Sequence, residues 1–123
     1  MNDSTQPPLV VDESAATTSV RLLLKSLTCS DSEAEVWGQL NQLSTQSSDL
    51  VLDMSSVGFL SSAALGKLIG LNRKLARKGG RVVLCGLDKE VESVFRVTRL
   101  DRILLICASV EDAFHLLNKE NKA

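Results

Sequence analysis

Short apolar runs alternate along this chain with longer segments of helical periodicity. Runs with the length of β-strands lie at Val20–Leu27, Leu50–Met54, Arg81–Gly86 and Ile103–Cys107, and Leu9–Val11 is a shorter candidate for an edge strand. Several of these runs are apolar at consecutive positions, which is typical of strands covered on both faces. Parallel or mixed strands joined by helices have this pattern.

Helical periodicity fills the segments between these runs. Helices are expected from Ser30 to about Ser44, over Ser62–Arg77, over Asp88–Val97 and from Ser109 to about Lys119. The second of these closes with a lysine and two glycines, as helix ends commonly do. The sequence therefore predicts a single α/β domain at residues 9–120, with a mixed β-sheet of about four to five strands and about four helices packed on it. Residues 1–8, which end in two prolines, are interpreted as a flexible tail.

The charge balance removes one class of partner. The chain carries 14 Lys and Arg against 15 Asp and Glu, and only 3% of its residues are aromatic. Nucleic-acid-binding domains usually have a basic surface or aromatic stacking platforms, so no nucleic-acid partner is expected. No apolar run approaches the roughly 18–20 residues of a membrane span, and the first residues do not resemble a signal peptide. We therefore expect a cytoplasmic protein with no membrane partner.

Few side chains are placed for catalysis. The three cysteines, Cys29, Cys85 and Cys107, are widely separated and indicate free thiols in a reducing compartment, with Cys85 and Cys107 at buried strand positions. The single histidine, His115, lies on the last predicted helix without an evident acidic partner. Hydrolase, dinucleotide-binding, P-loop and metal-ligand motifs are absent from the sequence. We therefore expect no catalytic residues, no metal and no cofactor, and a protein that is not an enzyme.

The helix predicted over Ser62–Arg77 has an unusual outer face. On a helical wheel the core side carries Ala64, Leu65, Leu68, Leu71 and Leu75, with Asn72 at its margin. The opposite side carries Ser62, Gly66, Ile69, Gly70, Arg73 and Arg77. Each interior glycine lowers helix stability by roughly 1 kcal/mol relative to alanine, and Ile69 is a large apolar group beside them. A partner-binding surface of Ser62, Gly66, Ile69, Gly70 and Arg73 accounts for both features; the alternative is that another element of the domain covers this face.

Two serines stand at the start of this helix. Ser61 is the natural N-cap, because its hydroxyl can accept an N–H of the first turn, and Ser62 is then the first helical residue. A serine at a helix start needs no further function. However, the N-terminal end of a helix also tolerates a phosphate, which would add about −1.5 to −2 charges beside the predicted partner-binding surface. Ser62 is therefore the candidate phosphorylation site, with Ser61 as the second choice.

The segment from Leu50 to Gly66, LVLDMSSVGFLSSAALG, resembles the signature of the STAS domains, which include the bacterial anti-sigma factor antagonists. In that family an apolar strand ends in Asp-Leu-Ser and is followed by a loop, Phe and Asp-Ser-Ser/Thr-Gly-Leu. The resemblance continues in order through GGRVVLCGL at Gly79–Leu87, VTRLD at Val97–Asp101 and VEDAF at Val110–Phe114. It covers roughly Val20–Leu117.

The resemblance implies a STAS-like fold and a mode of action. An unmodified antagonist of this family binds an anti-sigma factor, often itself a serine kinase, and releases the sigma factor. Phosphorylation of the serine after the signature aspartate abolishes that binding, and this serine corresponds to Ser62. The chain departs from the signature at Ser61, Ala63 and Ala64, in place of Asp, Ser/Thr and Gly, and at Arg99, where glycine is usual.

Three functions therefore stay open at the level of the sequence. The favoured one is a partner-switching regulator controlled at Ser62, with a serine-kinase-type anti-sigma factor as partner. The second is a constitutive STAS interaction module that uses the same helix face without phosphorylation. The third is a small-molecule-sensing domain, which a polar pocket near Ser55, Ser56 and Ser61 would favour. In each case the protein is expected to be a monomer or a weak dimer.

Overall fold

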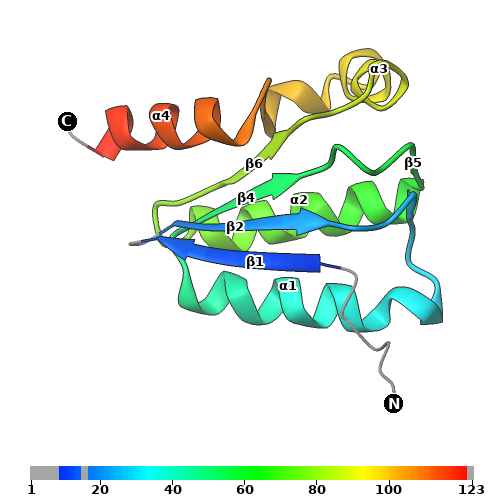
Figure 1. Cartoon of the computed structure of the whole chain (residues 1–123), viewed down its shortest axis with the longest axis horizontal. Coiled ribbons are helices and arrows are strands. Elements are labelled where there is room, and N and C mark those ends of the chain that lie inside the picture. Colours follow the sequence, from blue (N-terminus) through cyan, green and yellow to red (C-terminus); the bar gives the residue numbers. More distant parts are fainter. Residues whose placement is uncertain (1–8, 15–16, 122–123) are drawn as a thin grey trace.

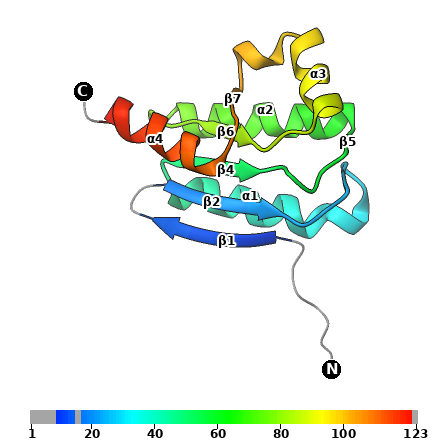
Figure 2. The same cartoon turned by 45° about the horizontal axis from the view of Figure 1, so that its top comes forward.

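The computed structural model describes residues 9–14 and 17–121. Its centre is a five-stranded sheet of order β1-β2-β4-β6-β7 (Figures 1 and 2). The strands are β1 (Leu9–Ser14), β2 (Thr17–Leu22), β4 (Asp49–Asp53), β6 (Val82–Cys85) and β7 (Leu105–Cys107). β1 is antiparallel to β2 and all other neighbours are parallel, so the sheet is mixed. The predicted α/β fold with a mixed sheet is confirmed.

Four α-helices surround this sheet. They are α1 (Ala34–Gln46), α2 (Ser62–Ala76), α3 (Lys89–Val97) and α4 (Val110–Asn121), with the 3-10 turns η1 (Asp31–Glu33) and η2 (Leu100–Arg102). Helices α1 and α2 lie side by side on one face of the sheet and α4 lies on the other (Figures 1 and 2). No helix among the described residues is long and apolar enough to cross a membrane.

Alternating strand residues feed two apolar cores. Leu50, Leu52 and Leu84 point to the α1–α2 side, where they are fully buried with α-helical residues such as Leu40 and Leu68. On the other face, a smaller cluster packs against α4 and contains Val51, Val83, Cys85, Ala113 and Leu117. Because helices cover both faces of β4 and β6, consecutive residues of these strands are apolar and alternate between the two cores.

The run Val20–Leu27, which was predicted to form one strand, is divided between two strands. β2 ends at Leu22, and Ser26–Leu27 forms a separate strand, β3, which pairs in parallel with β5 (Phe59–Leu60) in a second, two-stranded sheet. The sequence gives no sign of β5, because a two-residue strand has no periodicity and exists only through its pairing partner. This small sheet matters for function because β5 leads directly into α2.

The last predicted strand is also shorter than expected. Ile103 is 50% exposed, and its N–H closes the η2 turn on the carbonyl of Leu100 at 3.0 Å, so β7 begins only at Leu105. Cys85 is buried in β6 as predicted, but Cys107 is half-buried because β7 is the outermost strand on its side of the sheet. The predicted tail at residues 1–8 lies outside the described residues, and the domain boundary at residue 9 stays a prediction.

Candidate functional site

The start of α2 is held in place by the segment that precedes it. After β4, the N–H of Met54 donates to the carbonyl of Cys85 at 2.8 Å, and Met54 and Val57 are buried. Gly58 and Phe59 both donate to the carbonyl of Lys25, at 2.8 and 3.2 Å. These bonds, together with the β3–β5 pairing, join the entry of α2 to two separate parts of the fold.

Ser61 is the N-cap of α2, as the sequence analysis predicted. Its backbone is extended (φ −80°, ψ 161°), and its Oγ accepts the N–H of Ala64 at 3.1 Å. Its own N–H donates to the carbonyl of Leu27 at 3.0 Å. A cap of this kind stabilises a helix by about 1 kcal/mol, so the half-buried Ser61 has a structural role of its own.

Ser62 is the first residue of α2 and its side chain is exposed. Within the described part of the chain, its hydroxyl and the N–H groups of Ser62 and Ala63 have no hydrogen-bond partner. Free N–H groups at the positive end of a helix can receive the oxygens of a phosphate. The local structure therefore leaves the Ser62 hydroxyl accessible, at a helix end whose free N–H groups favour an anion.

No described residue covers the two glycines of α2. A Cβ atom built on Gly66 or Gly70 would have nothing within 4 Å outside the helix itself. Both glycines are exposed, as are Ser62 before them and Arg73 after them on the same side of the helix. The alternative that another element of the domain packs over this face is therefore excluded for the described residues. Packing among the described residues requires neither glycine.

Ile69 does not point freely outward. It is half-buried and packs against the main core, as Leu65 does. The reason is that this side of α2 is held against the rest of the domain by Asn72, which is next to Ile69 on the helical wheel. The side chain of Asn72 donates to the carbonyl of Ile103 at 3.4 Å and accepts the N–H of Val82 at 2.8 Å. Ile69 therefore lies at the margin of the exposed face rather than at its centre.

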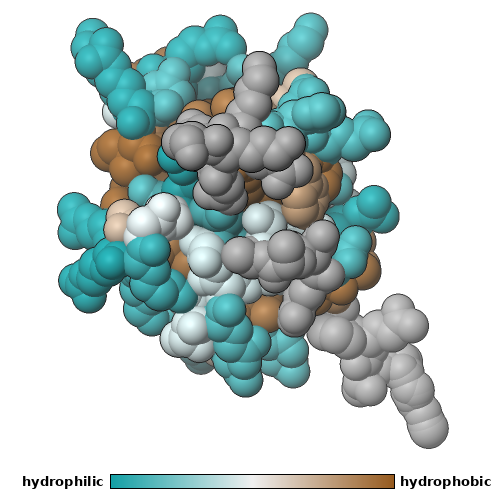
Figure 3. Space-filling view, turned by 90° about the vertical axis from the view of Figure 1, so that its left-hand side faces the viewer, coloured by the Kyte–Doolittle hydropathy of each residue, from teal (hydrophilic) through white to brown (hydrophobic). Residues whose placement is uncertain are grey.

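The other flank of α2 lies against α1. The Lys67 ammonium lies 5.7 Å from the centre of the Trp37 ring, within cation–π range, and Lys74 donates to the side chain of Asn41 at 2.8 Å. The exposed strip between these two flanks contains Ser62, Gly66, Gly70 and Arg73 of α2 and its C-cap residue Arg77. We call this strip the outer face of α2. Figure 3 views the molecule from the left-hand side of Figure 1, the end away from β5, where hydrophilic side chains project around hydrophobic patches.

An apolar hollow adjoins β5 on the side of α3. Its volume is about 240 Å³ and it is lined by Gly58, Phe59, Leu60, Glu90, Val91 and Val94. Phe59 is 56% exposed and Val94 is 38% exposed, so both present apolar surface at this hollow. The exposure of Phe59 could not be read from the sequence, because it depends on the pairing of β5 with β3. Ser55, Ser56 and Ser61, the residues expected around a sensor pocket, do not line this hollow.

The described residues offer little for catalysis or metal binding. They contain no group of three or more His, Cys, Asp and Glu side chains that could hold a metal ion. His115 is exposed on α4. Burial, with smaller contributions from the charge of Asp53 and from Cys107, raises the pKa of the Cys85 thiol from 9.0 to about 12. A thiol with such a pKa stays protonated near neutral pH and is a poor nucleophile.

Comparison with known proteins places this geometry in a family. The family model described as "STAS domain" matches residues 11–113, which is most of the chain. The chain belongs to the STAS domain family. The resemblance to the STAS domains, which the sequence showed between β4 and the capped start of α2, is therefore confirmed.

Solved STAS structures share the fold at low sequence identity. An anti-sigma-factor antagonist (STAS) domain protein from Planctomyces limnophilus has a TM-score of 0.78 at 16% identity, over 89% of this chain and 97% of that one. RsbS from Moorella thermoacetica, in a variant with serine replaced by glutamate, has 0.75 at 18% identity, over 94% and 98%. The anti-sigma factor antagonist SpoIIAA matches in its unphosphorylated form at 0.74 and 18% identity, over 90% and 96%. The phosphorylated form of SpoIIAA from Bacillus matches at 0.66 and 18% identity, over 89% and 98%.

Two further motif positions have a geometric reason in this STAS domain. A Cβ on Gly80 would overlap the backbone carbonyl of Ser48, so the chain can approach β4 only without a side chain there. Arg99 has φ 63° and ψ 20°, the left-handed region in which glycine is unstrained. A glycine, which is usual at this position in the family, would adopt this left-handed conformation without strain, whereas Arg99 adopts it at a cost in conformational energy.

Proposed function

We propose that this STAS domain is an anti-sigma factor antagonist that works by partner switching, with no catalytic activity of its own. In its unmodified form it binds an anti-sigma factor of the serine-kinase type through the outer face of α2. Phosphorylation of Ser62 releases that partner. The observation that carries the proposal is the position of Ser62. Its hydroxyl is exposed and has no hydrogen-bond partner among the described residues, and it lies at the N-terminal end of a helix face whose glycines contact no other described element.

The physical basis of the switch is an asymmetry between the free and the bound protein. In the free protein, a phosphate on Ser62 lies beside the unbonded N–H groups of the first turn, which favour it. In the complex, the same phosphate adds about −1.5 to −2 charges and several oxygen atoms to an interface that fits the small serine and glycine residues of α2. The fold therefore tolerates the modification and the interface does not.

The relatives support this reading. SpoIIAA is described in both an unphosphorylated and a phosphorylated form, and RsbS in a serine-to-glutamate variant. The same fold is thus found in a phosphorylated protein and in a protein with a serine replaced by an acidic residue. For this chain, Ser62 is the serine in register with the family signature and Ser61 already serves as the cap.

The charge of α2 indicates the chemistry of the partner's contact. Between Met54 and Leu87 the chain has six basic residues and no acidic one. Among these, Arg73 and Arg77 lie on the outer face, are exposed and make no ion pair with the described residues. We therefore expect the anti-sigma factor to place acidic side chains opposite the C-terminal half of α2, and the affinity to fall with rising salt.

One experiment separates switching from constitutive binding. The purified protein is incubated with ATP and each serine-kinase-type anti-sigma factor encoded in the same genome, and the modified residue is identified by intact mass and peptide mapping. We expect one phosphate, on Ser62, and loss of binding for Ser62→Asp but not for Ser62→Ala. Ser48→Asp, an exposed serine before β4, is the matched control for charge alone. If Ser62 is never modified and Ser62→Asp binds like the parent, the switch is refuted and the constitutive module remains.

A further inference from the structure

The two edges of the central sheet differ in how they are protected. β7, at one edge, is only three residues long, and short edge strands are a common protection against pairing with other chains. β1, at the other edge, is six residues long and begins with Leu9, Val10 and Val11. Val10 is 52% exposed and Val11 is 39% exposed. Among the described residues, only β2 pairs with β1, whose outer edge therefore presents a row of backbone groups flanked by apolar side chains.

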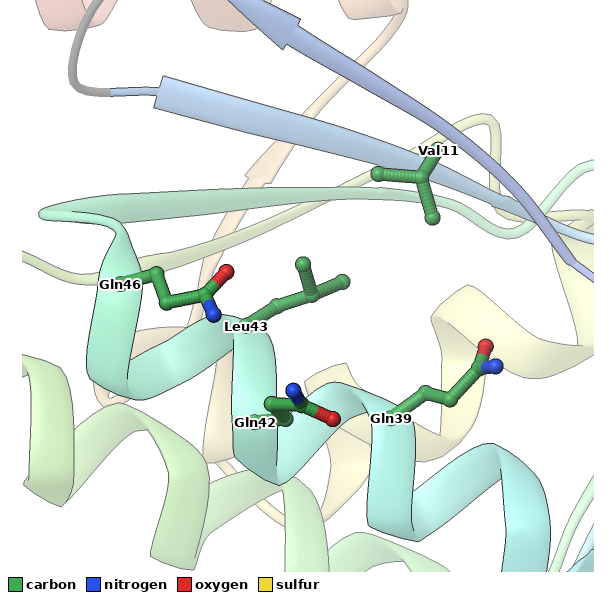
Figure 4. Close-up of a pocket in the computed structure, with 5 residues that line it drawn as sticks. All are labelled: Val11, Gln39, Gln42, Leu43 and Gln46. Carbon is green, nitrogen blue, oxygen red and sulfur yellow. The ribbon is translucent and has the colours of Figure 1, made fainter.

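A groove runs beneath this open edge. Its volume is about 290 Å³, and it is lined by Val11 of β1 and by Gln39, Gln42, Leu43 and Gln46 of α1. Figure 4 shows the side chains of Val11 and Leu43 directed toward each other across the groove, with the three glutamines along α1. The spacing of three and four residues puts the glutamines on one side of the helix. The edge strand and the groove form one continuous surface.

We propose that this surface, the β1 edge with the groove beneath it, binds a second copy of the same chain. The two β1 strands pair antiparallel across a two-fold axis and extend the five strands of each protomer into one sheet. The Val11 and glutamine side chains of the two protomers then meet in the joined grooves.

The chemistry of the groove favours a second copy over an unrelated partner. In a two-fold interface each side chain near the axis meets its own copy. An amide both donates and accepts hydrogen bonds, so glutamine is complementary to itself, whereas two arginines or two carboxylates repel each other. The described residues that line the groove carry amide and apolar side chains. The outer face of α2, with Arg73 and Arg77, lacks this self-complementarity.

The charges of β1 set the register of the pairing. With Val11 opposite its own copy, Val10 lies opposite Asp12, so the carboxylate of Asp12 does not face its own copy. A pairing centred on Asp12 would oppose two carboxylates and is disfavoured. A single pair of short strands gives a small interface, so we expect a weak dimer with a Kd on the order of 0.1 mM.

The dimer leaves the outer face of α2 free. On their side of the sheet, α1 lies next to the β1 edge and α2 lies beyond it, in contact with α1 and β6 (Figure 2). Self-association is therefore independent of the switch proposed at Ser62, and each protomer of the dimer could still hold its own partner.

Sedimentation velocity of the purified full chain, over concentrations from about 10 µM to about 1 mM, tests the proposal. We expect the parent to pass from monomer to dimer. Val11→Lys should weaken the association about tenfold or more, because it opposes two lysines at the axis. Val97→Lys, which changes the same residue type on the exposed side of α3, is the matched control and should dimerise like the parent.

A charge-swap pair keeps the test valid if Val11→Lys fails to fold. Gln42 is exposed at the middle of the glutamine row, so Gln42→Glu and Gln42→Lys are each expected to be monomeric alone and to form a mixed dimer when combined. A parent that stays monomeric throughout, or variants that dimerise as the parent does, would overturn the proposal. A chain without residues 1–8 that dimerises more strongly than the full chain would show that those residues cover the edge instead, and would also overturn it.

Discussion

Two pairs of glycines in this STAS domain have opposite surroundings. Gly66 and Gly70 lie in the interior of α2, where a side chain would meet open space and where glycine weakens the helix. Gly80 and Gly86 flank β6, where a Cβ would approach the backbone of Ser48 or the carboxylate and backbone around Asp53 and Ser55. One pair is required by the fold, and the fold alone gives no reason for the other. This difference separates the residues that build the domain from those proposed to bind a partner.

The largest effect is expected at Gly80. In Gly80→Ala the added methyl group overlaps the carbonyl of Ser48, which belongs to the backbone and cannot rotate away. We expect the free energy of unfolding to fall by about 3 kcal/mol or more, measured by urea denaturation. A Gly80→Ala variant as stable as the parent would show that the connection between α2 and β6 is not fixed as described.

Gly66 should respond in the opposite direction. Gly66→Ala is expected to raise the free energy of unfolding by about 1 kcal/mol, because alanine favours the helix and meets no neighbour. Gly66→Arg should leave the melting temperature nearly unchanged and abolish binding of the anti-sigma factor, because the side chain fills the space reserved for the partner. Arg73→Ala is the companion variant and should weaken binding mainly at low salt. Binding retained in Gly66→Arg would remove the outer face of α2 from the proposal.

Arg99 sharpens the comparison, because here a non-glycine residue occupies a glycine-type backbone. Its φ of 63° strains a residue with a Cβ, and glycine relieves that strain at the cost of greater freedom in the unfolded chain. We expect Arg99→Gly to be slightly more stable than the parent, by about 0.5 kcal/mol, in the same denaturation experiment. Arg99→Ala, which keeps a Cβ, should show no such gain.

An effect confined to alkaline pH concerns Cys85, at the end of β6 beside Gly86. Burial raises the pKa of this thiol to about 12 in the folded state, against 9.0 for the ordinary thiol. The unfolded chain therefore ionises first, so the stability that Cys85 contributes is fully present below pH 9 and is lost as the pH rises toward 12. Measured between pH 8 and about pH 10.5, the loss of stability should be steeper for the parent than for Cys85→Ala. Equal slopes would contradict the pKa shift.

Periodicity sufficed for the elements that have a core face of their own. α2, with Leu68, Leu71 and Leu75 at three- and four-residue spacing, was predicted almost to its last residue, and so was the cap at Ser61. The mixed sheet followed from apolar strands alternating with helices. Where an element depends on contacts made elsewhere, the sequence could not locate it. The two-residue strands β3 and β5 exist only as a pair, and Ile69 is covered because neighbouring Asn72 bonds to a distant part of the chain.

The candidate site shows the same division. Ser62, Gly66, Gly70 and Arg73 were placed together by helical geometry alone, since a wheel needs no tertiary information. Phe59 and the exposure of Val94 could not be found in this way. Both line the hollow beside β5, and that hollow depends on how α3 returns to the loop before α2. A surface contributed by one helix can be predicted from its sequence, and a surface shared between elements requires the structure.

The most direct test of the central claim is the affinity of a serine-kinase-type anti-sigma factor for this STAS domain before and after phosphorylation at Ser62. Isothermal titration calorimetry with the unmodified protein, the singly phosphorylated protein and Ser48→Asp measures it. We expect tight binding for the unmodified protein and for Ser48→Asp, and loss of at least about a hundredfold in affinity for the phosphorylated form. Equal affinities for the unmodified and the phosphorylated protein would contradict a switch at Ser62.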